Sequence, residues 1–151
     1  MAQFNVVGID GIISEMNRRT EKAVKKIPKM LEAGAAVLVE AQKAEVDAMV
    51  AMGLYHKKDA STRVYSPRSL GDLKKSIKAT KVKTDKSGFE YVDVYPQGKD
   101  SKGIRNADKG FTIEFGRSNT NAYHWMENAN AKAAEEVSAA MHRVWEDDSD
   151  G

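Results

Sequence analysis

Cysteine is absent from the 151-residue chain, which excludes disulfide scaffolds, cysteine-ligated zinc, thiol catalysis and iron–sulfur clusters. No apolar run approaches the ~20 residues that a membrane-spanning helix needs. The first residues, MAQFNVVGIDG, lack the charged start and the apolar stretch of a signal peptide. We therefore expect synthesis in the cytoplasm and no membrane partner. The length fits one globular domain, residues 1–151, and the 41% of hydrophobic residues argue against extended disorder.

Motifs for catalysis and for cofactor binding are also missing. The three histidines, His56, His124 and His142, do not form a metal-binding pair at helical spacing. The chain contains no Walker loop, no G-x-G-x-x-G motif and no nucleophile elbow. Glu135 and Glu136 are adjacent, so on a helix they point away from each other. We expect no enzyme activity, no bound metal and no cofactor.

Charge is segregated along the chain, although the net charge is only +2. Residues 56–88 contain ten basic and three acidic residues, whereas residues 127–151 contain two basic and seven acidic ones. The basic segment either contacts nucleic-acid phosphates, meets the acidic edge of a neighbouring copy, or is a solvated surface. Tyr65 is its single aromatic residue, which disfavours stacking on single strands. The lysines expected to form a basic surface, at an interface or along a DNA channel, are Lys74, Lys75, Lys78, Lys81 and Lys83.

Hydrophobic periodicity predicts a long helix near each end of the chain. Apolar residues recur every three or four positions from Ile9 to Met49, after a short predicted strand at residues 3–7. Pro28 lacks a backbone donor and is expected to kink or split this N-terminal helix, and Gly53 to end it. A C-terminal helix is predicted after Tyr123, and the acidic tail at residues 146–151 is expected to fray. The apolar face of this C-terminal helix comprises Met126, Ala129, Ala133, Val137, Ala140, Met141 and Val144.

The middle of the chain predicts a helix and a hairpin. A short helix at residues 69–76 leads into strands at 77–83 and 89–95, joined by a turn at 85–88. Residues 96–110 contain three glycines and a proline, and we expect a mobile loop that a partner orders. The whole pattern predicts an α+β fold. In it, an antiparallel sheet of three to four strands packs against a long kinked N-terminal helix and a C-terminal helix.

Residues 111–115 alternate between apolar and polar, which indicates a further strand with Glu114 on the face opposite Ile113 and Phe115. Glu114 is then either a solvent-facing carboxylate or the acceptor of a bond that fixes the next turn or a subunit contact. Arg117 is its candidate partner by proximity. We expect Glu114, Phe115, Gly116 and Arg117 to form a fixed turn near an interface. The residues expected to be mainly core are Phe115, Tyr123, Trp125 and Met126.

Three short motifs follow one another along the chain: Gly71, Leu73, Ser76 and Ile77, then the Glu-Phe-Gly motif at Glu114, Phe115 and Gly116, then Tyr123, Trp125 and Met126. In their order and spacing they resemble a family of long-tailed phage proteins described as tail components, neck proteins or head–tail joining proteins. The resemblance covers about residues 65–145 by motif and residues 3–55 by architecture. The chain departs from the family pattern at Leu70, Arg117 and His124.

The resemblance implies a non-enzymatic virion protein, assembled in the host cytoplasm and located in the neck or tail. It implies a ring of copies, hexameric if the family habit holds, between the head connector or adaptor and the tail tube or tail terminator. Double-stranded DNA would pass through the ring. The alternative from another class is a small basic nucleic-acid-binding protein that uses the Lys/Arg segment at residues 56–88.

Overall fold

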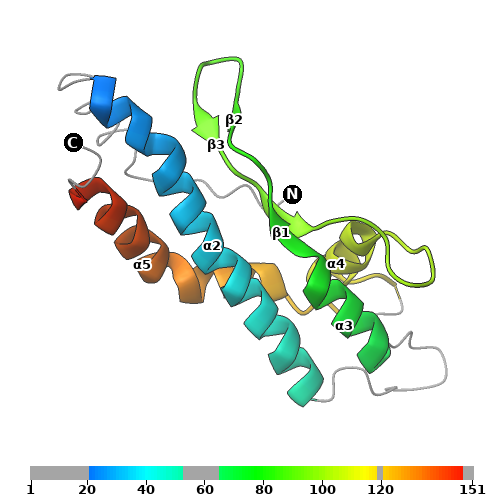
Figure 1. Ribbon diagram of the computed structural model, residues 1–151. Helices are drawn as coiled ribbons and strands as arrows, with labels where there is room; N and C mark the ends of the chain where they lie inside the picture. The colour runs from blue at the N-terminus through cyan, green and yellow to red at the C-terminus, as the bar shows by residue number, and fades with distance from the viewer. Residues whose placement is uncertain (1–20, 53–64, 119–120, 148–151) are drawn as a thin grey trace.

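The computed structural model of the chain describes residues 21–52, 65–118 and 121–147. The strand predicted at residues 3–7, the start of the N-terminal helix, Gly53 and the end of the acidic tail lie outside these ranges. Figure 1 shows the described elements in chain order. They are α2 (Glu21–Ala51), α3 (Pro67–Ser76), β1 (Ile77–Ala79), β2 (Lys83–Thr84), β3 (Glu90–Tyr91), β4 (Val94–Pro96), α4 (Asn106–Phe115) and α5 (Trp125–Glu146). The predicted α+β class is confirmed.

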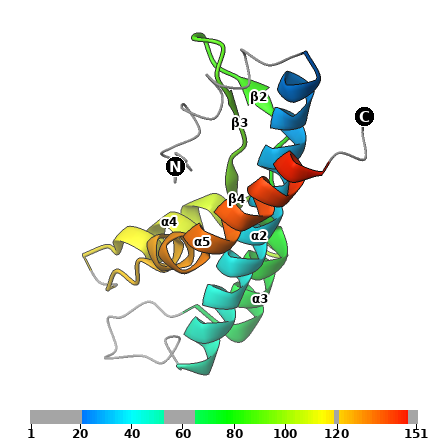
Figure 2. The ribbon, with the colours of Figure 1, turned by 90° about the vertical axis from the view of Figure 1, so that its left-hand side faces the viewer.

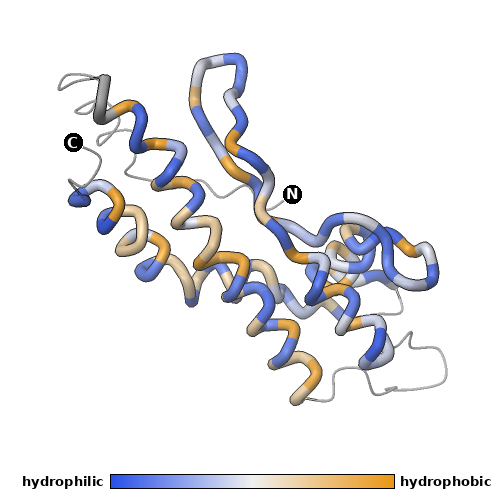
Figure 3. Tube along the Cα trace, viewed as in Figure 1, coloured by the Kyte–Doolittle hydropathy of each residue, from blue (hydrophilic) through white to orange (hydrophobic). Residues whose placement is uncertain are grey.

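Helices α2 and α5 run antiparallel and side by side, and the main core lies between them (Figures 1 and 2). Lys26, near the start of α2, donates to the carbonyl oxygen of Trp145 at the end of α5, at 2.9 Å. Gly34 permits this packing, because a Cβ there would lie 3.1 Å from the Met141 side chain and 3.2 Å from that of Val137. Figure 3 shows apolar positions recurring along both helices, as the sequence predicts.

Pro28 does not split the N-terminal helix. A single helix spans Glu21–Ala51 with Pro28 inside it, so the alternative of two helices is wrong. Buried residues continue at helical spacing beyond the proline, at Met30, Leu38 and Val46. Packing of this apolar face against α5 holds the helix together, since tertiary burial routinely outweighs local propensity.

The predicted hairpin is present as two short antiparallel ladders, β1 with β4 and β2 with β3. Between them the pairing is irregular, and Thr80 and Asp93 bridge the strands. Strict alternation from Ile77 would place Lys81 on the core side. The irregular stretch instead lets Val82 pack against the core and leaves Lys81 exposed. The outer part of the hairpin, residues 80–91, is called the hairpin arm here; it extends beyond the packed body in Figure 1.

The strand expected at residues 111–115 is wrong, because these residues form the second half of α4. The alternation over residues 111–115 is short enough to fit a helix as well. The inner face of this helix carries Gly110, Ile113 and Glu114, which are all buried. Phe111 and Phe115 lie one turn apart on the outer face, with ring centroids 6.0 Å apart. The first half of α4, residues 106–110, also replaces the end of the loop expected at residues 96–110. The mobility predicted for this loop stays a prediction.

The elements form layers around α2. On one side α2 contacts α5, and on the other it contacts α3, β1, β4 and β3 (Figures 1 and 2). The hairpin arm and α5 therefore lie on opposite sides of α2. This arrangement decides which surfaces one molecule offers to its neighbours.

Candidate functional site

Two of the five lysines predicted for the basic surface are paired within the molecule. Lys74 forms an ion pair with Asp47 of α2 at 2.7 Å. Lys83 pairs with Asp93 at 3.3 Å, and its ammonium lies 5.9 Å from the centre of the Tyr91 ring. Their charges are largely compensated within the chain.

Lys75, Lys78 and Lys81 are exposed and form no ion pair with any residue in the described ranges. Lys86, in the turn of the hairpin arm, is exposed in the same way. These four residues are called the basic surface below. Lys57, Lys58 and Arg63 belong to the same basic segment of the sequence but lie outside the described residues.

The outer face of α5 is acidic. Glu127, Glu135, Glu136 and Glu146 are all exposed along α5, with Glu135 on the side away from α2 and Glu136 beside it around the helix. Arg143 pairs with Glu136 at 2.8 Å, whereas Glu135 forms no ion pair within the described part of the chain. A shallow hollow lies on this face, lined by Ala134, Glu135, Ser138, Ala139, His142 and Arg143.

Glu114 joins α4 to α5. Its carboxylate is buried and accepts the backbone N–H of Met126 at 2.7 Å and that of Glu127 at 3.3 Å. The N-cap residue of α5, His124, has a left-handed backbone with φ 48° and provides no side-chain cap. Glu114 therefore takes the place of the N-cap side chain, with its negative charge at the positive end of the α5 dipole. Arg117, the expected partner of Glu114, is exposed and not involved.

The contact is reciprocal, because the chain that enters α5 caps the end of α4. The N–H of Tyr123 donates to the carbonyl oxygen of Ile113 at 2.8 Å, and that of His124 to the carbonyl oxygen of Glu114 at 3.2 Å. Gly116 follows with φ 73° and ψ 178°, a combination open essentially to glycine alone. The two helix ends thus satisfy each other's free backbone groups.

Trp125 fills the corner between α4, α5 and β4. It is fully buried, and its indole N–H donates to the carbonyl oxygen of Gly110 at 3.0 Å. A Cβ at Gly110 would lie 3.1 Å from Pro96 and 3.3 Å from Trp125. Met126 is buried and Tyr123 half-buried. Phe115, also expected in the core, is 67% exposed, because α4 turns its side chain to the outer face.

Glu114, His124 and Glu127 place potential ligand atoms within 4.8 Å of one another. Both carboxylate oxygens of Glu114 already accept backbone N–H groups. The cluster also lies at a helix N-terminus, where the potential favours anions over cations. Its geometry fits a helix cap better than a metal site.

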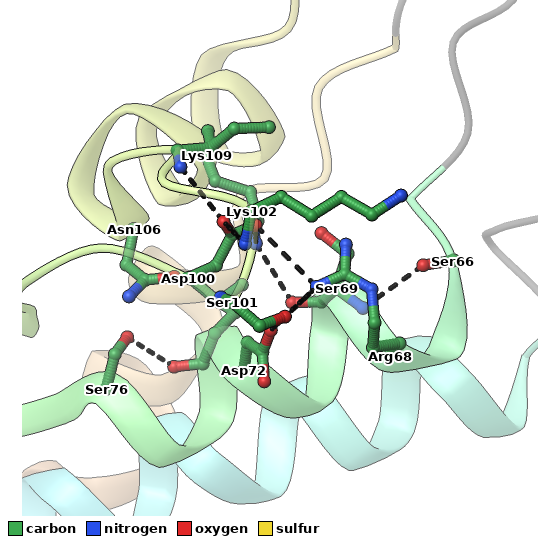
Figure 4. A network of polar contacts seen from close by, with 12 residues as sticks. Ser66, Arg68, Ser69, Asp72, Ser76, Asp100, Ser101, Lys102, Asn106 and Lys109 are labelled. Carbon is green, nitrogen blue, oxygen red and sulfur yellow. Dashed lines mark hydrogen bonds and ion pairs between the residues drawn. The ribbon is translucent and has the colours of Figure 1, made fainter.

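A buried ion pair, which sequence analysis did not find, fixes the loop before α4 (Figure 4). Lys109 of α4 donates to Asp100 at 3.0 Å and to the carbonyl oxygen of Ser69 at 3.1 Å. The other oxygen of Asp100 accepts the N–H groups of Lys102 and Ile104, both at 2.9 Å. These bonds hold the loop and α4 against the start of α3.

A second group of polar contacts lies beside this pair. Asp72 of α3 accepts the hydroxyl of Ser101 at 2.8 Å and the guanidinium of Arg68 at 2.8 Å. The hydrogen bonds from Ser101, together with the charge of Arg68, lower the pKa of the Asp72 carboxyl. The loop is therefore anchored to α3 at two neighbouring carboxylates.

The chain matches, over residues 10–125, the model of a protein family described as "Bacteriophage HK97-gp10, putative tail-component". The chain belongs to this family. The resemblance read from the motifs is confirmed. Searches of the curated proteins and of the solved structures gave no significant match. None of the described helices of this tail component is long and apolar enough to cross a membrane.

The motifs that carry the family resemblance serve folding. Leu73 and Ile77 are core residues of the tail component, and the Ser76 hydroxyl donates to the carbonyl oxygen of Leu73 at the end of α3. Glu114 and Gly116 shape the reciprocal cap. Membership gives the chain a structural role as a phage tail component, located with the virion.

The stability of the tail component should depend on the protonation of Asp100. The Lys109 ammonium, together with the N–H groups of Ile104 and Lys102, lowers the pKa of Asp100 from 3.8 to about 2. The folded state thus binds this proton less tightly than the unfolded state does. Its stabilisation is complete above pH 3.8 and is lost as the pH falls toward 2.

Urea unfolding at about pH 5 and at about pH 2.5 should show this loss in the wild type. Asp100→Asn should have a lower free energy of unfolding than the wild type at about pH 5. That free energy should decrease less than the wild-type value does as the pH falls. The pKa of Asp72 is lowered as well, so its carboxylate also stabilises the fold above its usual pKa, and Asp72→Asn is measured beside Asp100→Asn. An identical pH dependence in wild type and Asp100→Asn would contradict the assignment.

Proposed function

We propose that this tail component is a neck or tail-completion protein that joins the head connector to the tail by assembling into a ring, without catalysis. The observation that carries the proposal is the position of two oppositely charged surfaces. The basic surface lies on the arm side of α2, and the acidic face of α5 lies on the other. One molecule cannot bring its own two surfaces together.

Such an arrangement favours a heterologous contact, in which each copy offers its basic surface to the acidic face of the next. A heterologous contact generates a ring when its rotation closes. A hexamer is the size implied by the family resemblance. The head connector or adaptor would bind one rim, the tail tube or tail terminator the other, and double-stranded DNA would pass through the centre.

Light scattering across protein concentration and salt tests ring assembly. We expect one discrete oligomer at low salt that dissociates as salt rises, because the Debye length falls from ~10 Å at 0.1 M to ~3 Å at 1 M. A strict monomer under every condition would count against the proposal.

Charge reversal gives the matched test. The triple variant Lys78→Glu, Lys81→Glu, Lys86→Glu should abolish the oligomer, since like charges would then face each other. The control triple variant Lys99→Glu, Lys102→Glu, Arg105→Glu changes the net charge by the same amount on the exposed loop and should leave the oligomer intact. Equal effects of the two triples would show that net charge, and not this surface, controls assembly.

The basic surface, whose lysines form no ion pair within the described ranges, also favours the second candidate, a nucleic-acid-binding protein. Gel shift with duplex DNA should then show binding that weakens steeply with salt. Changing Lys78, Lys81 and Lys86 to Gln should abolish that binding. If these changes leave DNA affinity unaltered and block oligomer formation, the DNA-binding candidate fails.

A further inference from the structure

We propose that the tip of the hairpin arm docks into the hollow on the outer face of α5 of the next copy, with Phe89 as its apolar anchor and Lys86 paired with Glu135. This inference rests on the proposed ring assembly and names the contact that would build it. It concerns residues outside the motifs that define the family resemblance.

The arm tip is held in a fixed shape. One Asp85 carboxylate oxygen accepts the N–H of Ser87 at 2.8 Å and that of Phe89 at 3.0 Å. The N–H of Asp85 donates to the carbonyl oxygen of Phe89, and Gly88 adopts φ 88°. A tip that is already ordered loses little conformational entropy on docking.

Phe89 is a large hydrophobic residue at the surface of the molecule. Its side chain is 52% exposed at the end of the projecting arm, next to the exposed Lys86. A large aromatic side chain on a rigid projection, with a cation beside it, is typical of a residue that anchors a protein interface. The partner surface should therefore offer a shallow apolar seat with a carboxylate at its edge.

The hollow on α5 has these properties. Ala134, Ser138 and Ala139 supply small side chains, which leave room for an aromatic ring. Glu135 lies at its edge, exposed and without an ion pair in the described part of the chain. Arg143 and His142 also line the hollow; Arg143 pairs with Glu136, and the His142 ring lies 3.4 Å from Glu146. The Glu135 carboxylate is therefore the charge that Lys86 would meet, and the small side chains would seat Phe89.

Only a second copy brings the two together. The arm and α5 lie on opposite sides of α2, and the main contacts of α5 are with α2 and α4 (Figures 1 and 2). Each copy carries one arm and one hollow, so the contact repeats from copy to copy without a symmetric partner. This is the heterologous geometry that ring assembly needs.

Disulfide trapping tests the contact directly, because the chain has no cysteine of its own. The full-length double variant Ser87→Cys, Ser138→Cys places one exposed thiol on the arm tip and one in the hollow and keeps Phe89 and Lys86. On mild oxidation it should form a ladder of covalent dimers, trimers and larger species. The control pair Phe115→Cys, Ser138→Cys carries the same number of exposed thiols and should stay largely uncrosslinked. Equal ladders from both pairs would overturn the contact.

A charge-swap cycle gives the second measurement. Lys86→Glu and Glu135→Lys should each weaken self-association about fivefold, the range of an exposed ion pair. The double variant should return to near wild-type association. Additive losses would overturn the pairing, as would a Lys86→Glu variant that loses DNA binding and assembles normally.

The experiments separate failure of the contact from failure of the ring. If the wild type forms a discrete oligomer and the Ser87–Ser138 pair does not crosslink above its control, the contact is wrong and ring assembly stands. If the wild type is monomeric in all conditions and neither pair crosslinks, the ring proposal fails and the contact fails with it.

Discussion

Replacing Trp125 by alanine is expected to lower the free energy of unfolding by about 4 kcal/mol, the largest effect of any single change considered for this chain. The side chain is fully buried between α4, α5 and β4, so truncation leaves a cavity in the corner. It also removes the hydrogen bond to the carbonyl oxygen of Gly110. Urea unfolding followed by far-ultraviolet circular dichroism measures the change.

Two control variants separate the contributions at Trp125. Trp125→Phe keeps most of the ring volume and loses the indole N–H, so its cost should be well below that of Trp125→Ala. Trp145→Ala removes a half-buried side chain near the end of α5 and should cost less than Trp125→Ala. If Trp145→Ala were as destabilising as Trp125→Ala, the corner would not be the centre of packing that its burial indicates.

Sequence periodicity predicted the long elements because their burial is one-sided and sustained. The face of α5 expected to be apolar contains Met126, Ala129, Ala133 and Val137, and all four are buried. Helix α5 packs mainly against α2. The hairpin was likewise predictable from its turn at residues 85–88 and its flanking β-branched residues. The interruption of the strand pairing near Thr80 was not predictable, because the sequence there fits equally well with either set of alternating residues facing the core.

Helix α4 could not be predicted, because its residues carry two competing patterns. Alternation over five residues fits a strand, and the glycine-rich stretch before it fits a loop. What decides the outcome is long-range: Lys109 reaches Asp100 and the carbonyl oxygen of Ser69, which is forty positions earlier. A lysine in a polar, glycine-containing segment gives no sign in the sequence that it will be buried.

Composition predicted a surface of five lysines, and folding neutralises the charge of two of them. Two of the five lysines predicted for this surface pair with carboxylates elsewhere in the chain: Lys74 with Asp47, 27 positions earlier, and Lys83 with Asp93, 10 positions later. Counting charges along the chain cannot anticipate such pairs. The uncompensated charge is accordingly concentrated further along the hairpin than the sequence indicated, where Lys86 joins Lys78 and Lys81.

Sequence analysis left two alternatives for Glu114, a solvent-facing carboxylate and a hydrogen-bond acceptor, and the structure shows a buried acceptor whose partner is not Arg117. Proximity suggested Arg117, whereas the carboxylate accepts backbone N–H groups of Met126 and Glu127, twelve and thirteen positions later. The left-handed backbone of His124 leaves α5 without a side-chain cap of its own, so the acceptor has to come from another helix. The Glu-Phe-Gly motif is therefore the joint between α4 and α5.

Glu114→Ala should consequently destabilise the protein by about 3 kcal/mol, because the N–H groups at the start of α5 lose a charged acceptor in a site with little access to water. Glu114→Gln keeps one acceptor oxygen without the charge and should cost about half as much. Glu32→Ala, the same truncation at an exposed position of α2, should stay within about 0.5 kcal/mol of wild type. Urea unfolding measures all three, and hydrogen exchange should show faster exchange at the Met126 and Glu127 amides in Glu114→Ala. A Glu114→Ala variant as stable as Glu32→Ala would mean that α5 begins without help from α4.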